Sequence, residues 1–194
     1  TAATSADIGD DYQIIHGLTR DFNIDGQAGI VNPLGMNGKH LAVALHLVLN
    51  ASAVVQNIVN AINKVGVLVS GVVMQQLASA EAVLSADEKE LGIVLVDIGG
   101  GTTDLAFYSQ GSIWHSEVIP AGANLITKDI AIGIKAPLEE AEQLKREVGS
   151  IFPESVPVEE LIEVSEVGSG QRKTTSRRNL CQIIQARCDE TLQS

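Results

Sequence analysis

Aromatic residues are scarce in this sequence of 194 residues, at 3%, with three Phe, two Tyr and one Trp. A buried core therefore has to be built from Val, Ile, Leu and Ala. The hydrophobic content of 45% supplies enough of these side chains for an ordinary packed protein. At this length we expect one or two small domains.

Positively charged residues are also scarce. The sequence has 13 Lys and Arg and 24 Asp and Glu, for a net charge of -11. Phosphate contacts to nucleic acid need clustered Lys and Arg, so we expect no nucleic-acid partner. No stretch approaches the roughly 20 apolar residues that span a bilayer. The longest apolar run, "LAVALHLVLN", is broken by His46 and alternates like a strand.

The N-terminus, "TAATSADIGDD", has no initiator Met, no basic region and no apolar region, so it is not read as a signal peptide. It favours a segment of a longer protein. The two cysteines, Cys181 and Cys188, are seven residues apart in a helical pattern, about 10 Å along a helix and beyond disulfide reach. The four histidines have no triad or ligand spacing and are interpreted as structural.

The first part of the chain, residues 1–73, has the pattern of a small α+β unit. Strand-like runs cover residues 12–18, 21–24 and 41–49, and Asp25-Gly26 is a hairpin signal. Ser52 is predicted to cap a helix that Gly66 closes. The run "VLVSGVVM", residues 67–74, is predicted to be another strand.

The rest of the chain alternates strands and helices in a different order. One helix is predicted through residues 77–90, followed by a three-strand meander over residues 93–96, 105–108 and 113–119. Helices are predicted over 124–132, from Pro137 to Gly149, and over 176–192. Between the last two, residues 152–171 are expected to be a loop with the short strand "LIEV".

The glycine-rich stretch "VDIGGGTTD", residues 96–104, separates the first two strands of the meander. A P-loop needs Lys and Ser or Thr after the last glycine, and the dinucleotide fingerprint needs a following helix. A strand follows here, so both motifs are excluded. What remains is a hairpin tip whose backbone N–H groups form an anion-binding concavity, with Thr102 and Thr103 adding hydroxyl donors.

Asp97 stands beside this concavity and would repel a phosphate. Its presence is explained if Mg²⁺ lies between them, because Mg²⁺ takes one or two carboxylates together with phosphate oxygens and water. The alternative is a tight glycine hairpin in which Asp97 is only a turn residue.

"VDIGGGTTD" is similar to the second phosphate-binding hairpin of the actin, DnaK-type chaperone and sugar kinase superfamily. The flanking stretches "FNIDGQAGIVNPLGMNGKHL", "LASAEAVLSADEKELG", "IPAGANLITKDIAIGIKAPLEEAEQLK" and "IEVSEVG" resemble the bacterial FtsA family. The resemblance implies a mixed α/β chain with an actin-like ATPase fold, in which an RNase H-like βββα core follows a small α+β inserted subdomain.

The resemblance also implies four segments. Residues 1–73 would form the inserted (SHS2-like) subdomain, and residues 74–92 the closing helix of the first nucleotide-binding subdomain. Residues 93–150 would form the second nucleotide-binding subdomain, with the phosphate hairpin. Residues 151–194 would begin the last subdomain.

Roles in ATP and Mg²⁺ binding follow from the resemblance, position by position. Asp97 would hold Mg²⁺ through water, and Glu81 would orient the attacking water. The β- and γ-phosphates would be wrapped by Gly99, Gly100, Gly101, Thr102 and Thr103. Gly122 and Asn124 belong to "PAGAN", in the place of a glycine loop that approaches the nucleotide. The family usually has two adjacent glycines there, whereas this chain has Gly122 and then Ala123.

Glu142 and Lys145 match helix positions that contact adenosine hydroxyls in DnaK-type relatives. The alternative is a solvated i,i+3 ion pair, and for Glu81 it is an exposed helix carboxylate. A basic cluster of Arg172, Lys173, Arg177 and Arg178 would face acidic lipid or a partner, or is only a solvated face.

The function implied is that of an ATP-binding cell-division protein with at most weak ATPase activity. It would polymerise, link the FtsZ ring to the inner membrane from its cytoplasmic face, and recruit later division proteins through the inserted subdomain. The family's first phosphate loop, its adenine loop and its C-terminal membrane helix are not in this sequence, so we expect this chain alone to bind ATP weakly. Alternatives are a PilM-like scaffold of a pilus or secretion machine, or a small-molecule kinase. The kinase is disfavoured because no second catalytic carboxylate stands on a substrate loop.

Overall fold

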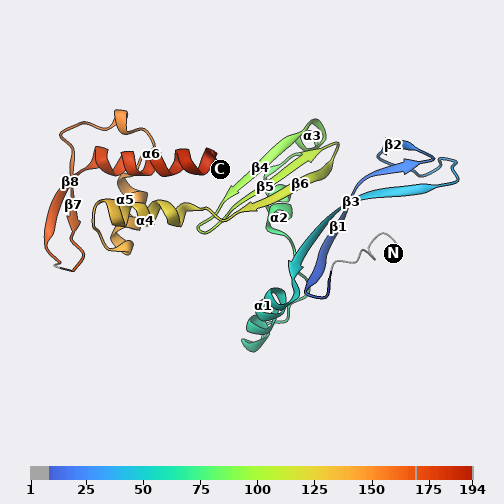
Figure 1. Cartoon of the computed structure of the whole chain (residues 1–194), viewed down its shortest axis with the longest axis horizontal. Coiled ribbons are helices and arrows are strands. Elements are labelled where there is room, and N and C mark those ends of the chain that lie inside the picture. Colours follow the sequence, from blue (N-terminus) through green and yellow to red (C-terminus); the bar gives the residue numbers. More distant parts are fainter. Residues whose placement is uncertain (1–8, 169, 194) are drawn as a thin grey trace. The chain divides into compact units, whose positions relative to one another are not determined.

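The computed structural model describes residues 9–168 and 170–193 (Figure 1). The chain forms two compact units. Unit 1 is the chain up to Asp97 together with Asp104–Val118, and unit 2 is Ile98–Thr103 together with the chain from Ile119 onward. The N-terminal stretch 1–8, for which no signal peptide is predicted, lies outside the described residues.

The first sheet of unit 1 has the order β2-β1-β3 and is antiparallel, with β1 (Tyr12–Ile24), β2 (Gln27–Ile30) and β3 (Leu41–Ala51). The predicted turn at Asp25-Gly26 is confirmed, with φ of 48° and 94°. β1 is one strand where two were predicted. Its pairing with β3 shifts register twice, and each bulge interrupts the alternation of side chains that marks a strand in sequence.

Helix α1 (Ser52–Lys64) confirms the predicted helix, but the cap prediction is wrong. The N-cap is Ala51, and Ser52 is already the first helical residue. The Ser52 N–H, which has no acceptor within the helix, donates to the Asp11 carbonyl oxygen at 2.9 Å. The helix therefore starts directly from the end of β3. Gly66 closes it as predicted, with φ of 83° and its N–H donating to the Asn63 carbonyl oxygen at 3.0 Å.

The strand predicted over residues 67–74 is wrong, since no strand lies between α1 and α2 in this part of the described chain. Val and Leu favour strands by packing against a neighbouring strand, and a run without such a neighbour stays irregular. Leu68 accordingly remains 89% exposed.

The single helix predicted over residues 77–90 is two helices, α2 (Gln75–Val83) and α3 (Ala86–Leu91). Leu84 is extended between them, and Ser85 begins α3 with a capping box. The Glu88 N–H donates to Ser85 Oγ at 3.3 Å, and the Ser85 N–H donates to the Glu88 carboxylate at 2.8 Å. This reciprocal pair of hydrogen bonds stabilises the start of a new helix at Ser85, in competition with an extension of α2 through the same residues.

The predicted meander is confirmed as β4 (Ile93–Ile98), β5 (Thr103–Ser109) and β6 (Ser112–Ile119), in that order across the sheet. Gln110 and Gly111 form the second turn with φ of 52° and 72°. Helix α2 packs on this sheet through Ala80, which is fully buried. The core of this region consists of Ala80, Leu95, Ala106, Tyr108 and Ile113.

Unit 2 contains α4 (Ala123–Gly133), α5 (Leu138–Val148), the 3₁₀ turn η2 (Pro153–Ser155) and α6 (Arg177–Gln193), with β7 (Leu161–Ser165) pairing with β8 (Arg172–Ser176). The strand β8 was not predicted. Pro137 precedes α5 as its N-cap instead of being its first helical residue. On the predicted apolar face of α6, Leu180 is fully buried and Leu192 is exposed.

The core of unit 2 is aliphatic, as the scarcity of aromatic residues predicts, and contains Ile130, Ile134, Val164, Leu180 and Ile184. Cys181 is buried and Cys188 partly buried, and both are free thiols, as their spacing predicts. Among the described helices, none has the length and apolar character needed to cross a bilayer.

Candidate functional site: a glycine turn and two carboxylate clusters

The glycine turn joins β4 to β5 and lies in unit 2. Its ends are joined by the Gly99 N–H, which donates to the Thr102 carbonyl oxygen at 2.8 Å, so Gly100 and Gly101 form the tip. None of the three glycines has a positive φ. The reason for glycine here is therefore space around the backbone, and not a left-handed torsion.

The carbonyl groups of this turn cap helix α4. The Ala123 N–H donates to the Gly99 carbonyl oxygen at 3.0 Å, and the Asn124 N–H donates to that of Gly100 at 2.8 Å. The first N–H groups of a helix lack acceptors within the helix, and the turn supplies acceptors for two of these N–H groups. The turn and the start of α4 thus form one backbone-bonded structure.

Gly122, the N-cap of α4, is where the two segments approach most closely. A Cβ at this position would lie 2.6 Å from the Gly100 carbonyl oxygen and 2.7 Å from that of Gly99. Only glycine fits there. The next residue, Ala123, is helical and keeps its Cβ, so a single glycine suffices for the approach.

The tip itself has room that the fold does not use. A Cβ on Gly101 would meet nothing within 4 Å, whereas one on Gly100 would lie 3.3 Å from the Asn124 amide and one on Gly99 3.2 Å from the Thr102 carbonyl oxygen. Over the described residues, neither the Gly100 nor the Gly101 N–H donates to another backbone group. Glycine at position 101 therefore leaves an open, donor-lined tip.

Thr103 is buried beside this turn and acts as an anchor. Its hydroxyl donates to the Ala121 carbonyl oxygen at 2.7 Å. Because a threonine hydroxyl has one proton, this bond occupies the donor that the sequence assigned to phosphate. The phosphate roles of Thr102 and Thr103 stay predictions.

Glu142 and Lys145 form the first carboxylate cluster, on α5 in unit 2, with their charged atoms 2.6 Å apart. The hydroxyl of Thr127, on α4, donates to the same Glu142 oxygen at 2.5 Å, and Arg146 Nε donates to the other at 2.9 Å. The hydrogen bond from Lys145, and to a smaller extent that from Thr127, lowers the pKa of Glu142 from its ordinary 4.5 to about 2. The i,i+3 ion pair is thus present, and the adenosine role stays a prediction.

Asp97 is the centre of the second cluster, in unit 1. Gln75 Nε2 donates to its carboxylate at 3.0 Å and Ser79 Oγ donates at 2.8 Å, and these bonds, the Gln75 one first, lower its pKa. Gln75 and Ser79 were not predicted. Their spacing of four residues, which places them on one face of α2, was the available signal.

Glu81 lies on α2 as well but is not among the described partners of Asp97. Its carboxylate forms an ion pair with the Lys89 ammonium, with 2.6 Å between the charged atoms, and the Glu81 side chain is 80% exposed. Lys89 in turn lies 5.7 Å from the centre of the Tyr108 ring. The contacts of Glu81 are those of an exposed helix carboxylate, and its role in orienting water stays a prediction.

No group of three or more His, Cys, Asp or Glu side chains is arranged to hold a metal within residues 9–168 and 170–193. Asp97 alone fits Mg²⁺ only when phosphate oxygens and water complete the shell. Among its described partners, the ionised Asp97 carboxylate has two neutral hydrogen-bond donors and no cation. It is therefore suited to be a ligand of a hydrated Mg²⁺ ion.

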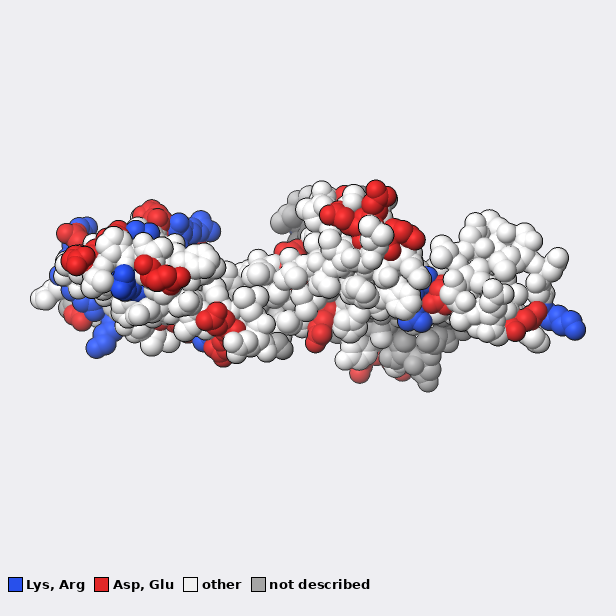
Figure 2. Space-filling view, turned by 90° about the horizontal axis from the view of Figure 1, so that it is seen from above, with Lys and Arg blue, Asp and Glu red and all other residues white. Residues whose placement is uncertain are grey.

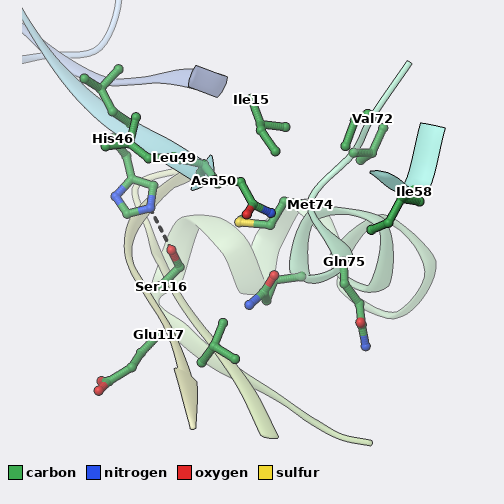
Figure 3. A pocket seen from close by; sticks show the side chains of 15 residues that line it. Ile15, His46, Leu49, Asn50, Ile58, Val72, Met74, Gln75, Ser116 and Glu117 are labelled. Carbon is green, nitrogen blue, oxygen red and sulfur yellow. Dashed lines mark hydrogen bonds between the residues drawn. The ribbon is translucent and has the colours of Figure 1, made fainter. Parts of the chain in front are cut away.

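A cavity of about 620 Å³ lies elsewhere in unit 1 (Figure 3). Its walls are largely aliphatic and come from β3, β6 and the segment before α2. Figure 3 shows the His46 ring turned toward Ser116, 2.9 Å from its hydroxyl, while the Glu117 carboxylate points away. Partial burial is the main cause that lowers the pKa of His46, and the charges of His115 and Arg20 lower it further.

The basic cluster of unit 2 is paired within the chain. Arg172 contacts Glu163, Lys173 contacts Glu166, Arg177 contacts Glu160, and Arg178 donates to the Val156 carbonyl oxygen. At the end that carries β7 and β8, the face in Figure 2 shows Lys and Arg interspersed with Asp and Glu. These contacts favour the solvated-face interpretation over a lipid-binding patch.

Two family models match the chain. The model for "Cell division protein FtsA" matches residues 94–191, and that for "SHS2 domain inserted in FTSA" matches residues 1–49. Similar curated proteins named cell division protein FtsA come from Neisseria meningitidis (41% identical), Escherichia coli K12 (36%) and Bacillus subtilis (33%). The matches cover 97%, 98% and 99% of this chain but 45%, 45% and 44% of those proteins, so the chain spans less than half their length.

Among solved structures, the PilM–PilN type IV pilus biogenesis complex is similar at a TM-score of 0.55 and 17% identity, over 75% of this chain and 40% of that chain. At this identity the likeness bears on the fold alone. It confirms, with the family models, the predicted mixed α/β chain with an actin-like fold.

Proposed function

The chain belongs to the FtsA family of actin-like cell-division proteins, and from this premise we propose that unit 2 carries one side of an ATP site. The observation that carries the proposal is the tip of the glycine turn. There, a Cβ on Gly101 would meet nothing, and the Gly100 and Gly101 N–H groups have no backbone acceptor among the described residues. An array of free N–H groups without side chains suits the oxygens of a terminal phosphate.

The cap on α4 supports the same proposal. Because α4 satisfies the Gly99 and Gly100 carbonyl groups, these electronegative atoms are held in protein hydrogen bonds. A phosphate approaching the tip would therefore meet donors with less repulsion from the carbonyl oxygens. For Asp97, which lies in unit 1, the role proposed is the one that the family resemblance implies, to hold a hydrated Mg²⁺.

The direct test follows the turn amides in a ¹⁵N-labelled chain as Mg-ATP is added to millimolar concentration, so that weak binding is visible. We expect the Gly100 and Gly101 signals to move. Gly101→Val places a branched side chain in the space that the phosphate needs and abolishes the response. The matched control is Gly71→Val, because a Cβ on Gly71 also meets nothing within 4 Å and its φ is not positive.

Gly71→Val should respond as the wild type does. Unmoved turn amides in the wild-type chain, or an equal response in Gly101→Val, would contradict the phosphate role of the turn.

The cellular role that we propose is that of the family. The protein polymerises, links FtsZ to the cytoplasmic face of the inner membrane, and recruits later division proteins through the SHS2 region. Support comes from family membership and from the matches over both the SHS2 region and residues 94–191. Co-sedimentation tests the FtsZ contact. The chain is used at a concentration at which it stays in the supernatant when spun alone. Its recovery in the pellet with polymerised FtsZ supports the contact, and its absence from that pellet contradicts it.

A further inference from the structure

The ring of His16 on β1 makes a hydrogen bond that leaves its own sheet. The Met74 backbone N–H donates to His16 Nε2 at 3.0 Å, across 58 residues of sequence. His16 is partly buried. Both residues belong to unit 1, and the bond joins the sheet β2-β1-β3 to the segment that starts α2.

This bond requires a neutral ring. In a neutral imidazole one ring nitrogen is an acceptor, whereas in the protonated ring both nitrogens are donors. Protonation would therefore place a ring N–H against the Met74 N–H and leave that backbone group without its acceptor. No charged side chain is among the described partners of His16, which faces Val48 across the sheet. Because the charge of histidine ordinarily changes between about pH 5 and 8, the bond is open to control by pH.

Met74 is the N-cap of α2, the helix that carries the partners of Asp97. Its carbonyl oxygen accepts two of the first N–H groups of the helix, at 3.1 and 3.3 Å, and its side chain makes no capping bond. His16 therefore fixes the backbone at the residue where α2 begins. Gln75 and Ser79, which follow on α2, both donate to the Asp97 carboxylate.

A second histidine contact joins the same sheet to β6. His46 Nε2 lies 2.9 Å from Ser116 Oγ (Figure 3). Burial, and then the charges of His115 and Arg20, lower the pKa of His46, so the folded structure favours its neutral ring. The charged neighbours are already paired with each other, at 3.0 and 3.6 Å, as Arg20–Asp21 and His115–Glu117. A proton on His46 therefore adds a cation that is not paired with a described carboxylate.

We propose that the hydrogen bond from Met74 to His16 is a pH-sensitive contact that ties the sheet β2-β1-β3 to the start of α2. The neutral ring holds the two together, and protonation releases the N-cap of α2 from β1. The His46 contact weakens in the same direction. The backbone bonds within the sheet involve no titratable group, so the sheet stays paired while α2 and its two Asp97 partners lose a restraint. This inference does not depend on the proposed ATP site.

The direct test measures the scalar coupling across this hydrogen bond, between the Met74 amide nitrogen and His16 Nε2, in the ¹⁵N-labelled chain. We expect the coupling at about pH 8 and its loss at about pH 5. The loss should follow the ring ¹⁵N shifts that report protonation of His16. A coupling that persists after the ring is protonated, or none at about pH 8, overturns the inference.

Substitutions at position 16 separate the bond from the titration. His16→Leu removes the acceptor, so the Met74 amide should exchange its hydrogen about tenfold faster than in the wild type at about pH 8. His16→Gln supplies an acceptor that does not titrate, and it should keep the protection of Met74, relative to the intrinsic exchange rate, at both pH values. The wild-type coupling and His16→Gln decide the matter if His16→Leu does not fold.

His40→Leu is the matched control, because His40 is exposed and its ring makes no described hydrogen bond. It should leave the exchange of Met74 as in the wild type. His46→Gln distinguishes the two histidine contacts, and Met74 should still lose its protection as His16 titrates. Equal effects of His16→Leu and His40→Leu, or loss of the pH dependence in His46→Gln, overturn the inference.

Discussion

Gly101 lies in the glycine turn and Gly122 packs against it, yet the structure requires glycine only at position 122. We expect Gly122→Ala to lower the free energy of unfolding by about 1–3 kcal/mol, because its Cβ would lie 2.6 Å from the Gly100 carbonyl oxygen. Gly101→Ala should change it by less than about 1 kcal/mol, since its Cβ has open space. Urea denaturation measures both. Equal losses would show that the described cap is wrong.

Glu142 predicts a dependence of stability on pH. Its folded pKa, about 2, lies below its ordinary 4.5, so its ionised form stabilises the fold. This contribution is complete above about pH 4.5 and is lost as the pH falls toward about 2. The free-energy difference between wild type and Glu142→Gln should therefore shrink over that range in denaturation experiments. Glu139→Gln, exposed on the same helix, is the control.

A constant difference between wild type and Glu142→Gln from neutral to acid pH would contradict the described ion pair.

At this scale the sequence predicted the turn residues and the Glu142–Lys145 pair but not their partners. Thr127 and Glu142 are 15 residues apart on different helices, and Thr127 has no feature of its own that predicts a buried contact. Such bonds depend on how helices pack, and side-chain periodicity does not encode that packing. Gln75 and Ser79 are different, because their spacing alone placed them on one face.

Among the elements, α3 depends on its own start signal. Ser85→Ala removes the hydroxyl that accepts the Glu88 N–H and should lower the free energy of unfolding by about 1 kcal/mol. Ser70→Ala, at an exposed position outside helices and strands, should have little effect. Thermal or urea unfolding compares the two, and an equal effect of both substitutions would rule out the capping role.

The elements predicted best were those with a strong local pattern, namely the meander β4-β5-β6, the strand β3 and the helices α1, α4, α5 and α6. The two failures among the strands have a common cause. The run 67–74 has the side chains of a strand without a described neighbour to pair with, and β8 is rich in polar residues and forms only by pairing with β7. Strands depend on partners far away in sequence, whereas helices form from local bonds.

For the whole molecule, both the fold class and the family were predicted from the resemblance carried by the glycine turn and its flanking stretches, and the family models confirm them. The acidic balance and the aliphatic core were readable from composition alone. The division into two units was not readable from the sequence, because the boundary falls inside one motif, with Asp97 in unit 1 and the glycine turn in unit 2. The predicted segment boundaries at residues 73, 92 and 150 stay predictions.

The central claim is that the glycine turn binds the terminal phosphates of a nucleotide. The most direct measurement compares the shifts of the Gly100 and Gly101 amides with the Mg²⁺ complexes of ATP, ADP and AMP at equal concentration. We predict the largest shifts with ATP, smaller shifts with ADP, and none with AMP, which lacks the β- and γ-phosphates. Shifts of equal size with all three nucleotides, or none with ATP, would contradict the claim.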